Sequence, residues 1–561
     1  IYVDANARPG GTGSSSRPFQ SITEAVGRAA RSGDVILVRP GVYSPSLTGE
    51  TLPIGSPGPG LNRIPAGVKL VGSGAANTII DAEETLRSGS PVNAMGVGSD
   101  NVRIAGFTIR NSSAVGIFIL NADHVEIDSN FFVGNGRFAV GASGTGGLVV
   151  RDNVARSNNE TGFSVADAPR TSVPNPPAGC PAAFGACVIN NIANEHSRDG
   201  FLFTTGGDYH ILNNAALNNG ISGIEVNNRN NLRPLNSVVK GNLTSNNGGV
   251  LFPFSGTGIL ITEFAHATEL SDNQANNNRP GGIAVFEDSS ADVVRNNVIR
   301  NSKQNGLVVQ KRSMVQTLTD NQVVNSGLSG IFVENDAVVD TIRGNTVTNN
   351  GTCADCTAAK GGLAILGRSV VRLIDNNDFD RNALGAQIAN DSVAESITRT
   401  SFDSNTDGGI LVRVNSSLPD FSGNTVRNNG GRDRASIALD DSTGYIRDSE
   451  ISSIEGDGVN LFNASELTVE GGSVSHAGLN GFSVYDGSRL TLQSVAVEDN
   501  GDSGVLATGA NSDVTVIDSQ VRNNMGYGLN AQNSAVIRCQ GSTEVSGNGE
   551  GQTLGSVEGC D

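Results

Sequence analysis

The chain has 561 residues, a net charge of −18, 72 glycines and no tryptophan. Such an acidic chain repels nucleic-acid phosphates and anionic membrane surfaces, so we expect neither as a partner. No run of 18 or more apolar residues is present, which excludes a membrane-spanning helix of ordinary length. The composition is uniform along the chain, and this uniformity favours one repetitive architecture over several unrelated domains.

The N-terminal region, residues 1–98, begins at Ile1, which we interpret as the start of a mature secreted protein after removal of a signal peptide. Residues 19–33 carry apolar side chains at helical spacing, and Gly33 follows as a stop signal. These residues predict a short amphipathic helix that caps the first coils of the repeat described next. Its apolar positions are Ile22, Ala25, Val26, Ala29 and Ala30.

A repeat of about 24 residues fills residues 99–538. Each copy has a Gly that leads an alternating apolar strand, and from Gly258 to Gly330 these glycines recur every 24 residues. A second marker keeps the same period at Asn273, Asn297, Asn321, Asn345, Asn377, Ser401, Asn424, Ser449, Ser473, Ser494, Ser519 and Ser542. Three short strands per repeat can stack on their equivalents one coil away, with apolar residues inward and Gly or Asn at positive-φ corners. The repeat therefore predicts an all-β fold, a single-chain parallel β-helix of about 17 coils.

Three excursions interrupt this period, near residues 168–190, 227–257 and 350–361, and long loops on a solenoid usually carry its function. The six cysteines fall into three close pairs, which favours disulfides formed in an oxidising compartment. The Cys353–Cys356 spacing could also form half of a zinc site, but no second such pair and no histidine lies nearby. We expect Cys180–Cys187, Cys353–Cys356 and Cys539–Cys560, the last closing a C-terminal cap over residues 539–561.

The opening of the chain resembles secreted bacterial β-helix proteins of the pectin-lyase-like superfamily, many of which carry a domain of unknown function there. The resemblance covers roughly the first 80 residues and rests on Ile1-Tyr-Val-Asp, Gly11-Thr-Gly, Arg17-Pro-Phe, Gly33-Asp-Val-Ile-Leu-Val and Pro40-Gly-Val-Tyr. It implies a right-handed helix, export and a connection to polysaccharides. It does not imply one activity, because this superfamily includes lyases, hydrolases, epimerases, adhesins and inert surface proteins.

Candidate catalytic residues gather on the irregular coils between residues 195 and 270, where three of the five histidines lie. Carboxylates flanked by His and Arg suit acid/base chemistry on a glycan, although longer loops also carry more polar residues for structural reasons. The candidates are Glu225, Glu263, His210, His266, Arg198 and Asp199, with Glu195, His196 and Asp208 nearby. Asp440-Asp441 superficially resembles a hydrolase pair, but we interpret it as a solvated turn.

No cofactor is required by these motifs. Asp- and Asn-rich turns could hold Ca²⁺, although the Gly-Gly-x-Gly-x-Asp calcium repeat is absent, and no residues are assigned to a metal. Two functions from different classes remain open. The first is an extracellular structural or adhesive protein, a subunit of a filament or sheath that assembles with copies of itself. The alternative is a polysaccharide-active enzyme (a lyase, hydrolase or epimerase) or a glycan-binding protein that uses a groove on coils 195–270.

Overall fold

The computed structural model describes residues 1–28, 31–58, 63–83, 91–229, 235–248, 256–354, 356, 358–430 and 435–560. Within these residues the chain winds about 19 turns of parallel strands, slightly more than the 17 expected, so the predicted all-β solenoid is confirmed. Two compact units are distinguished: Ile1–Ala284 with Asp288–Ala291, and Val285–Glu287 with Asp292–Asp561. Each is described by itself.

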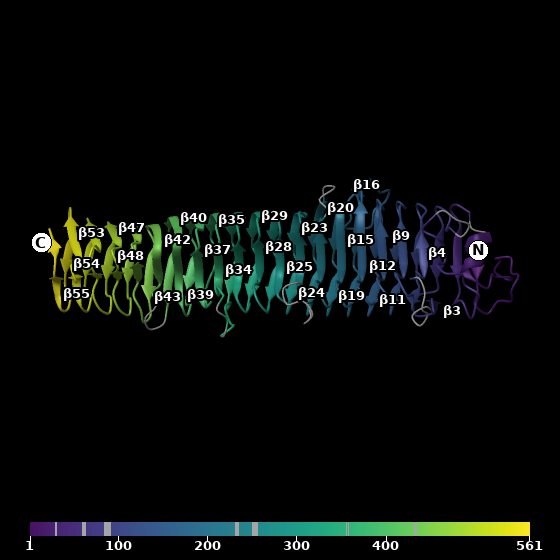
Figure 1. The fold of residues 1–561 in the computed structure, drawn as a ribbon, viewed down its shortest axis with the longest axis horizontal. Coiled ribbons are helices and arrows are strands. Elements are labelled where there is room, and N and C mark those ends of the chain that lie inside the picture. Colours follow the sequence, from purple (N-terminus) through teal and green to yellow (C-terminus); the bar gives the residue numbers. More distant parts are fainter. Residues whose placement is uncertain are drawn as a thin grey trace. The chain divides into compact units, whose positions relative to one another are not determined.

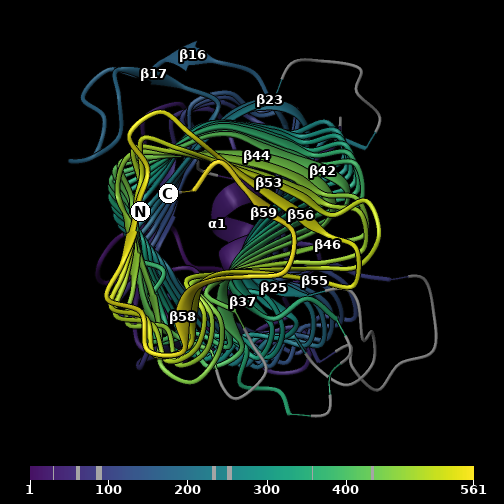
Figure 2. The same ribbon diagram turned by 90° about the vertical axis from the view of Figure 1, so that its left-hand side faces the viewer.

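The first unit opens with strand β1 (Tyr2–Val3), helix α1 (Ile22–Arg28) and strand β2 (Val35–Val38). Helix α1 buries Ile22, Ala25 and Val26, as its spacing predicts, and is the purple coiled ribbon in Figure 2. The expected helix positions Ala29 and Ala30 lie outside the described residues. The carboxylate of Glu50 accepts hydrogen bonds from the backbone N–H groups of Ile22 and Thr23 at 2.7 and 2.9 Å, which satisfies the first turn of the helix.

A typical turn of the first unit consists of β22 (Ile224–Asn227), β23 (Leu235–Lys240) and β24 (Leu243–Ser245). It pairs in parallel with β25 (Thr257–Thr262), β26 (His266–Ser271) and β27 (Gln274–Asn276) of the next turn, a succession that Figure 1 shows in teal. Inward side chains such as Ile224 and Val226 are fully buried and stack on Ile259 and Ile261. These aliphatic columns form the core because alternate strand residues point inward.

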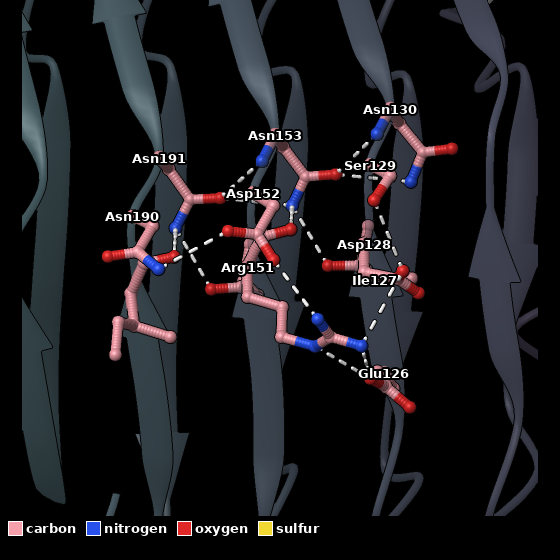
Figure 3. Close-up of polar contacts among 12 residues, drawn as sticks. Glu126, Ile127, Asp128, Ser129, Asn130, Arg151, Asp152, Asn153, Asn190 and Asn191 are labelled. Carbon is pink, nitrogen blue, oxygen red and sulfur yellow. Dashed lines mark hydrogen bonds and ion pairs between the residues drawn. The ribbon is translucent and has the colours of Figure 1, made fainter. Parts of the chain in front are cut away.

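An asparagine ladder runs between the second and third strands of successive turns (Figure 3). The Oδ1 atom of Asn153 accepts from both the backbone N–H and the side-chain amide of Asn130, at 3.0 and 3.1 Å, and Asn191 does the same for Asn153. In the second unit the ladder continues through Asn297, Asn321, Asn345 and Asn377. The next rung is Thr400, so the expected position at Ser401 was wrong by one residue. The expected positions Ser473, Ser494 and Ser542 were also wrong by one, because the register places Gly472, Val495 and Thr543 there.

A second ladder, which the sequence reasoning missed, lies five residues further along each turn. Asn158 Oδ1 accepts from the backbone and side-chain N–H groups of Asn135 at 3.1 and 2.8 Å. Equivalent bonds join Asn219, Asn247 and Asn278 in the first unit. In the second unit they join Asn350, Asn382, Asn405 and Asn429, and then Asn500, Asn524 and Asn548.

The second ladder explains the repeated glycine. A Cβ atom on Gly481 would lie 2.6 Å from the carbonyl oxygen of Gly504 and 2.9 Å from Nδ2 of Asn500. Gly481 therefore provides room for the next turn and is not among the residues of positive φ. The positive-φ corners, expected at Gly or Asn, are occupied by residues such as Asn296, Asp320 and Gly344.

Four strands of the second unit carry the site described below: β39 (Leu384–Ala389), β42 (Gly408–Ser422), β44 (Ile437–Arg447) and β46 (Val459–Phe462). Their register aligns two outward columns. One column holds Gln387, Leu411, Ala438 and Asn460, and the other holds Ala389, Arg413, Asp440 and Phe462.

All three expected disulfides are present. Cys353 and Cys356 are bonded to each other, so the zinc interpretation is excluded. In the first unit, the excursion closed by Cys180–Cys187 contains a small antiparallel hairpin, β16 (Thr171–Ser172) with β17 (Ala183–Phe184). This hairpin segment packs Phe184 and Cys180 over an outward apolar patch of Val149, Ile189 and Leu212.

Candidate functional site

The strand that carries Glu225 presents its carboxylate on the outer face of the first unit. Glu225 lies on β22, in register between Leu202 of the preceding turn and Leu260 of the following one. The side-chain amide of Asn227 donates to Glu225 Oε1 at 2.7 Å. Burial raises the pKa of Glu225, and the nearby charge of Glu263 raises it further. This carboxyl group therefore holds a proton more readily than an ordinary glutamate does.

Asp199 lies directly before Gly200 and is only 1% exposed. Its Oδ1 atom accepts from the backbone N–H of Ser222 in the next turn at 3.0 Å. Burial, and after it the charge of Glu225, raise the pKa of Asp199 to about 7, against the opposing charge of Arg198. The same position in the second unit is occupied by Asp457, which accepts from the backbone N–H of Asn480 at 2.8 Å. Asp199 thus has a structural role, because it accepts the backbone hydrogen bond that links its turn to the next one.

Four of the predicted residues form one electrostatic group. The charges of Glu263 and Arg198 act on Glu225, and Glu225 acts on Asp199. Glu263 occupies a positive-φ corner and forms an ion pair with Arg229 at 3.0 Å. With Arg229, the group therefore combines three carboxyl groups, of which Asp199 and Glu225 have a raised pKa, with two guanidinium groups.

The structure places the two predicted histidines, His210 and His266, on the second strand of their turns, whereas Glu225 lies on the first. His210 lies in the later part of β20 (Phe201–Leu212), in register with Val238 of β23. Its Nε2 atom is 3.1 Å from Asp208, which also pairs with Arg170 at 2.8 Å. His266 opens β26 and its Nδ1 atom lies 2.8 Å from Ser290 Oγ. Glu225, by contrast, lies in the β22 column, so these contacts do not join either histidine to the group formed by Glu225, Glu263 and Asp199.

His196, a neighbour of the candidate group, is part of the interior. It is 2% exposed and takes the place of an asparagine in the second ladder. The backbone N–H of Asn158 donates to its Nδ1 atom at 3.2 Å, and its own backbone N–H donates to Asn219 Oδ1 at 3.1 Å. Burial lowers the pKa of His196 to about 4. The side chain is therefore neutral near pH 7 and has no access to a substrate.

A solvent-open hollow of about 390 Å³ lies on the outer face of the second unit, over β39, β42, β44 and β46. Its floor is the column from Gln387 to Asn460, where Ala438 leaves a gap between two larger side chains. Residues 358–360 line it too, directly after the Cys353–Cys356 disulfide. Lys360 Nζ donates to the carbonyl oxygen of Cys353 at 3.1 Å, which ties this loop to the hollow.

Asn460 lines this hollow with a largely buried side chain. The residue is 9% exposed, and its Oδ1 atom is buried without a hydrogen-bond partner. The side chain of Asn460 also bonds to Asp457, whose pKa burial raises. A buried amide oxygen that lacks a donor costs about 1–3 kcal/mol of stability.

The other column supplies charge and an aromatic ring. Gln387 Oε1, in its correct amide orientation, accepts from Arg413 Nε and Nη2 at 3.1 Å, which fixes the guanidinium. Asp440 accepts from the side-chain amide of Asn463 at 2.6 Å. The ring of Phe462 stacks on that of Tyr485, with centroids 5.1 Å apart and planes 5° from parallel. The hollow thus presents a guanidinium, a carboxylate and an aromatic ring.

The sequence reasoning missed this hollow. It treated Asp440-Asp441 as a solvated turn, which fits Asp441, exposed and at φ +51°, but not Asp440, a half-buried strand residue that lines the hollow. A small residue in an outward column between larger ones, Leu411 before Ala438 and Asn460 after it, is the signal that could have revealed it.

Among the described residues, no group of three or more His, Cys, Asp or Glu side chains is arranged to hold a metal ion. The Ca²⁺ that acidic turns could hold stays a prediction. In the same part of the chain, no helix combines the length and apolar character needed to cross a bilayer.

Three families match parts of the chain. "Right handed beta helix region" matches residues 183–298 and 415–552. "Periplasmic copper-binding protein (NosD)" matches residues 255–395, and "Protein of unknown function (DUF1565)" matches residues 6–175. With the coils described above, these matches confirm the right-handed parallel β-helix that the resemblance to the pectin-lyase-like superfamily implies. A search of curated proteins finds no match.

Solved structures with similar folds include the A-module of mannuronan C-5 epimerase AlgE6 from Azotobacter vinelandii (15% identity, 86% of this chain and 93% of that chain covered, TM-score 0.30). Others are pectate lyase Pel9A (13%, 66% and 76%, TM-score 0.30) and the catalytic domain of a GH87 alpha-1,3-glucanase (13%, 64% and 63%, TM-score 0.33). These similarities are too distant to carry an activity over to this chain.

Proposed function

We propose that this chain binds a polysaccharide in the hollow over β39, β42, β44 and β46, in an oxidising compartment outside the cytoplasm. The observation that carries the proposal is an open hollow lined by the guanidinium of Arg413, the carboxylate of Asp440 and the ring of Phe462. A sugar hydroxyl can donate to Asp440, and its own oxygen can accept from Arg413. The volume of about 390 Å³ falls within the range of ligand sites, roughly 300–1,000 Å³. Three disulfides favour the oxidising compartment.

A polymer suits the site better than a compact ligand. The floor column continues in register beyond the hollow, through Ala364 on one side and Ser483 on the other. A chain laid along the turns could therefore extend past the hollow without meeting a change of strand direction. The stacked rings of Phe462 and Tyr485 offer an apolar surface where the hydroxyl-poor face of a sugar can pack.

Affinity electrophoresis through gels that contain neutral or acidic polysaccharides tests this proposal. We expect at least one polysaccharide to retard the native chain and Phe462→Ala to lose most of the retardation. Phe131→Ala is the matched control, because Phe131 is a partly buried outward phenylalanine of β11 (Phe131–Val133) in the first unit, in register with Thr108 and Val154, and is not part of the hollow lining. Equal retardation of both variants, or none of the native chain, would reject the site.

An acid/base enzyme is the second candidate, favoured by the raised pKa values of Asp199 and Glu225. Asp199 is buried, so Glu225 would exchange the proton with a glycan and Asp199 would position and tune it. Lyase, hydrolase and epimerase reactions all use such a group. If Glu225 is catalytic, Glu225→Gln abolishes turnover, whereas Asp199→Asn retains turnover with a shifted pH profile. Unchanged turnover in Glu225→Gln would reject this candidate.

Copper is not part of the proposal. Within residues 255–395, which match a family named for copper binding, His266 contacts Ser290 and the two cysteines are bonded to each other. The described residues there contain no group of three or more His, Cys, Asp or Glu side chains arranged to hold a metal ion. Self-assembly into a filament or sheath stays a prediction, since nothing in the described residues specifies a partner copy.

A further inference from the structure

A second hollow, of about 530 Å³, lies near the N-terminus of the first unit and is lined by three guanidinium groups. These belong to Arg8, Arg17 and Arg39, and Asp4 is the acidic residue in the lining. Three positive charges and one negative charge leave the lining at +2. Residues 1–39 contain five arginines against Asp4, Glu24 and Asp34, also +2, whereas the whole chain carries −18. Positive charge is therefore concentrated here against the trend of the molecule.

The loop that forms this hollow is held in shape. The backbone N–H groups of Thr12 and Gly13 both donate to the carbonyl oxygen of Arg17, at 2.8 and 3.0 Å. A Cβ atom on Gly11 would lie 2.0 Å from the carbonyl oxygen of Pro18, so the two sides of the loop touch. A ligand would therefore meet a loop that is already ordered, which reduces the entropic cost of binding.

Two of the three guanidinium groups are positioned by neighbours. Arg39 pairs with Asp4 at 3.1 Å and donates to the carbonyl oxygen of Ser15 at 2.7 Å. Arg17 donates to the carbonyl oxygen of Gly10 at 3.3 Å. Arg8 is exposed on the same rim. Since Asp4 offsets one arginine, the other two present an uncompensated pair of charges to the hollow.

We propose that this arginine-lined hollow binds a doubly charged oxyanion, a phosphate or sulfate group, either free or as a monoester. A dianion matches the +2 charge of the lining. The planar guanidinium fork matches the oxygens of phosphate and sulfate in a bidentate manner, which a singly charged carboxylate would use less fully. Because the arginines are solvent-exposed, the binding is expected to weaken as salt concentration rises.

Isothermal titration calorimetry of the full chain at low ionic strength, with inorganic phosphate, inorganic sulfate, methyl phosphate and acetate, tests the proposal. We expect saturable binding of the dianions at least tenfold tighter than that of acetate. Arg8→Gln with Arg17→Gln should weaken it tenfold or more. Arg28→Gln, which removes one positive charge on α1 outside the hollow and so matches Arg8→Gln alone, should change it less than twofold. Tighter binding of methyl phosphate than of phosphate would assign the site to an ester, and the reverse to the free ion.

Equal weakening by Arg28→Gln and by the double variant would show non-specific attraction and overturn the proposal, as would the absence of saturable binding. Thermal unfolding monitors whether the loop survives the double variant. If it does not, Arg8→Gln alone, for which a threefold or greater loss is expected, decides the question, because Arg8 lies on the rim and its backbone is not part of the loop closure.

Discussion

The Nδ1 atom of His196 accepts a hydrogen bond from the backbone N–H of Asn158 at 3.2 Å. In the same way, the Oδ1 atom of Asn219 accepts a hydrogen bond from the backbone N–H of His196. A histidine thus replaces an amide in an interior ladder, but it does so incompletely, because its Nε2 atom is buried without a hydrogen-bond partner. Because His196 is buried and its Nε2 atom lacks a partner, it stabilises the ladder of the first unit less than an asparagine would.

His196→Asn is expected to stabilise the chain by about 1 kcal/mol near pH 7, since an amide can supply both the acceptor and a donor. The folded-state pKa of His196, about 4, lies below the unfolded value of 6.5, so the folded state binds fewer protons. The native chain should therefore lose stability as pH falls from 6.5 to 4, by on the order of 3 kcal/mol. Urea unfolding across this range should give a flatter profile for His196→Asn; identical profiles would contradict the ladder role.

Asp199 has the opposite pH dependence. Its folded-state pKa, about 7, lies above the unfolded value of 3.8, so its contribution is fully favourable below 3.8 and is lost as pH rises through 7. Asp199→Asn keeps the acceptor for Ser222 and removes the charge beside Glu225. We expect it to raise the free energy of unfolding at pH 8 by at least about 1 kcal/mol and to have little effect at pH 4. A variant less stable than the native chain at pH 8 would show that the carboxylate is needed.

Gly481→Ala tests why glycine leads each strand. The new Cβ would lie 2.6 Å from the carbonyl oxygen of Gly504, and the crowded turns would have to separate. We expect a loss of about 1–3 kcal/mol in chemical unfolding. Ser483→Ala, two residues along the same turn, serves as the control and should cost less than half as much. Equal losses would mean that close approach is not what selects glycine.

The repeat could be predicted from the sequence because its two markers, the strand-leading glycine and the ladder asparagine, each meet a structural requirement that recurs in every turn. Gly481 must make room for Asn500, and Asn153 must satisfy Asn130, so neither position tolerates free variation. Other features depend on residues brought together only by folding. Glu50 caps helix α1, which begins 28 positions earlier in the chain, and no local sequence pattern predicts this contact.

The candidate site was less predictable than the fold. Glu225, Asp199 and Glu263 were grouped from their types and density, and the structure places them in one electrostatic group. Histidines were grouped with them although His210 lies in register with Val238, in another column. Outward columns carry no periodic constraint, so the gap above Ala438 could be found only once the register of β42, β44 and β46 was known.

The measurement that tests the central claim most directly compares Asn460→Leu with Asn530→Leu in binding the polysaccharide that the native chain retains. Both asparagines lie in the same outward column and are similarly buried, 9% and 7% exposed, but Asn530 of β55 (Tyr527–Gln532) is not part of the hollow lining. We predict at least a tenfold loss of affinity for Asn460→Leu and less than a twofold change for Asn530→Leu. Undiminished binding by Asn460→Leu would contradict a polysaccharide site in this hollow.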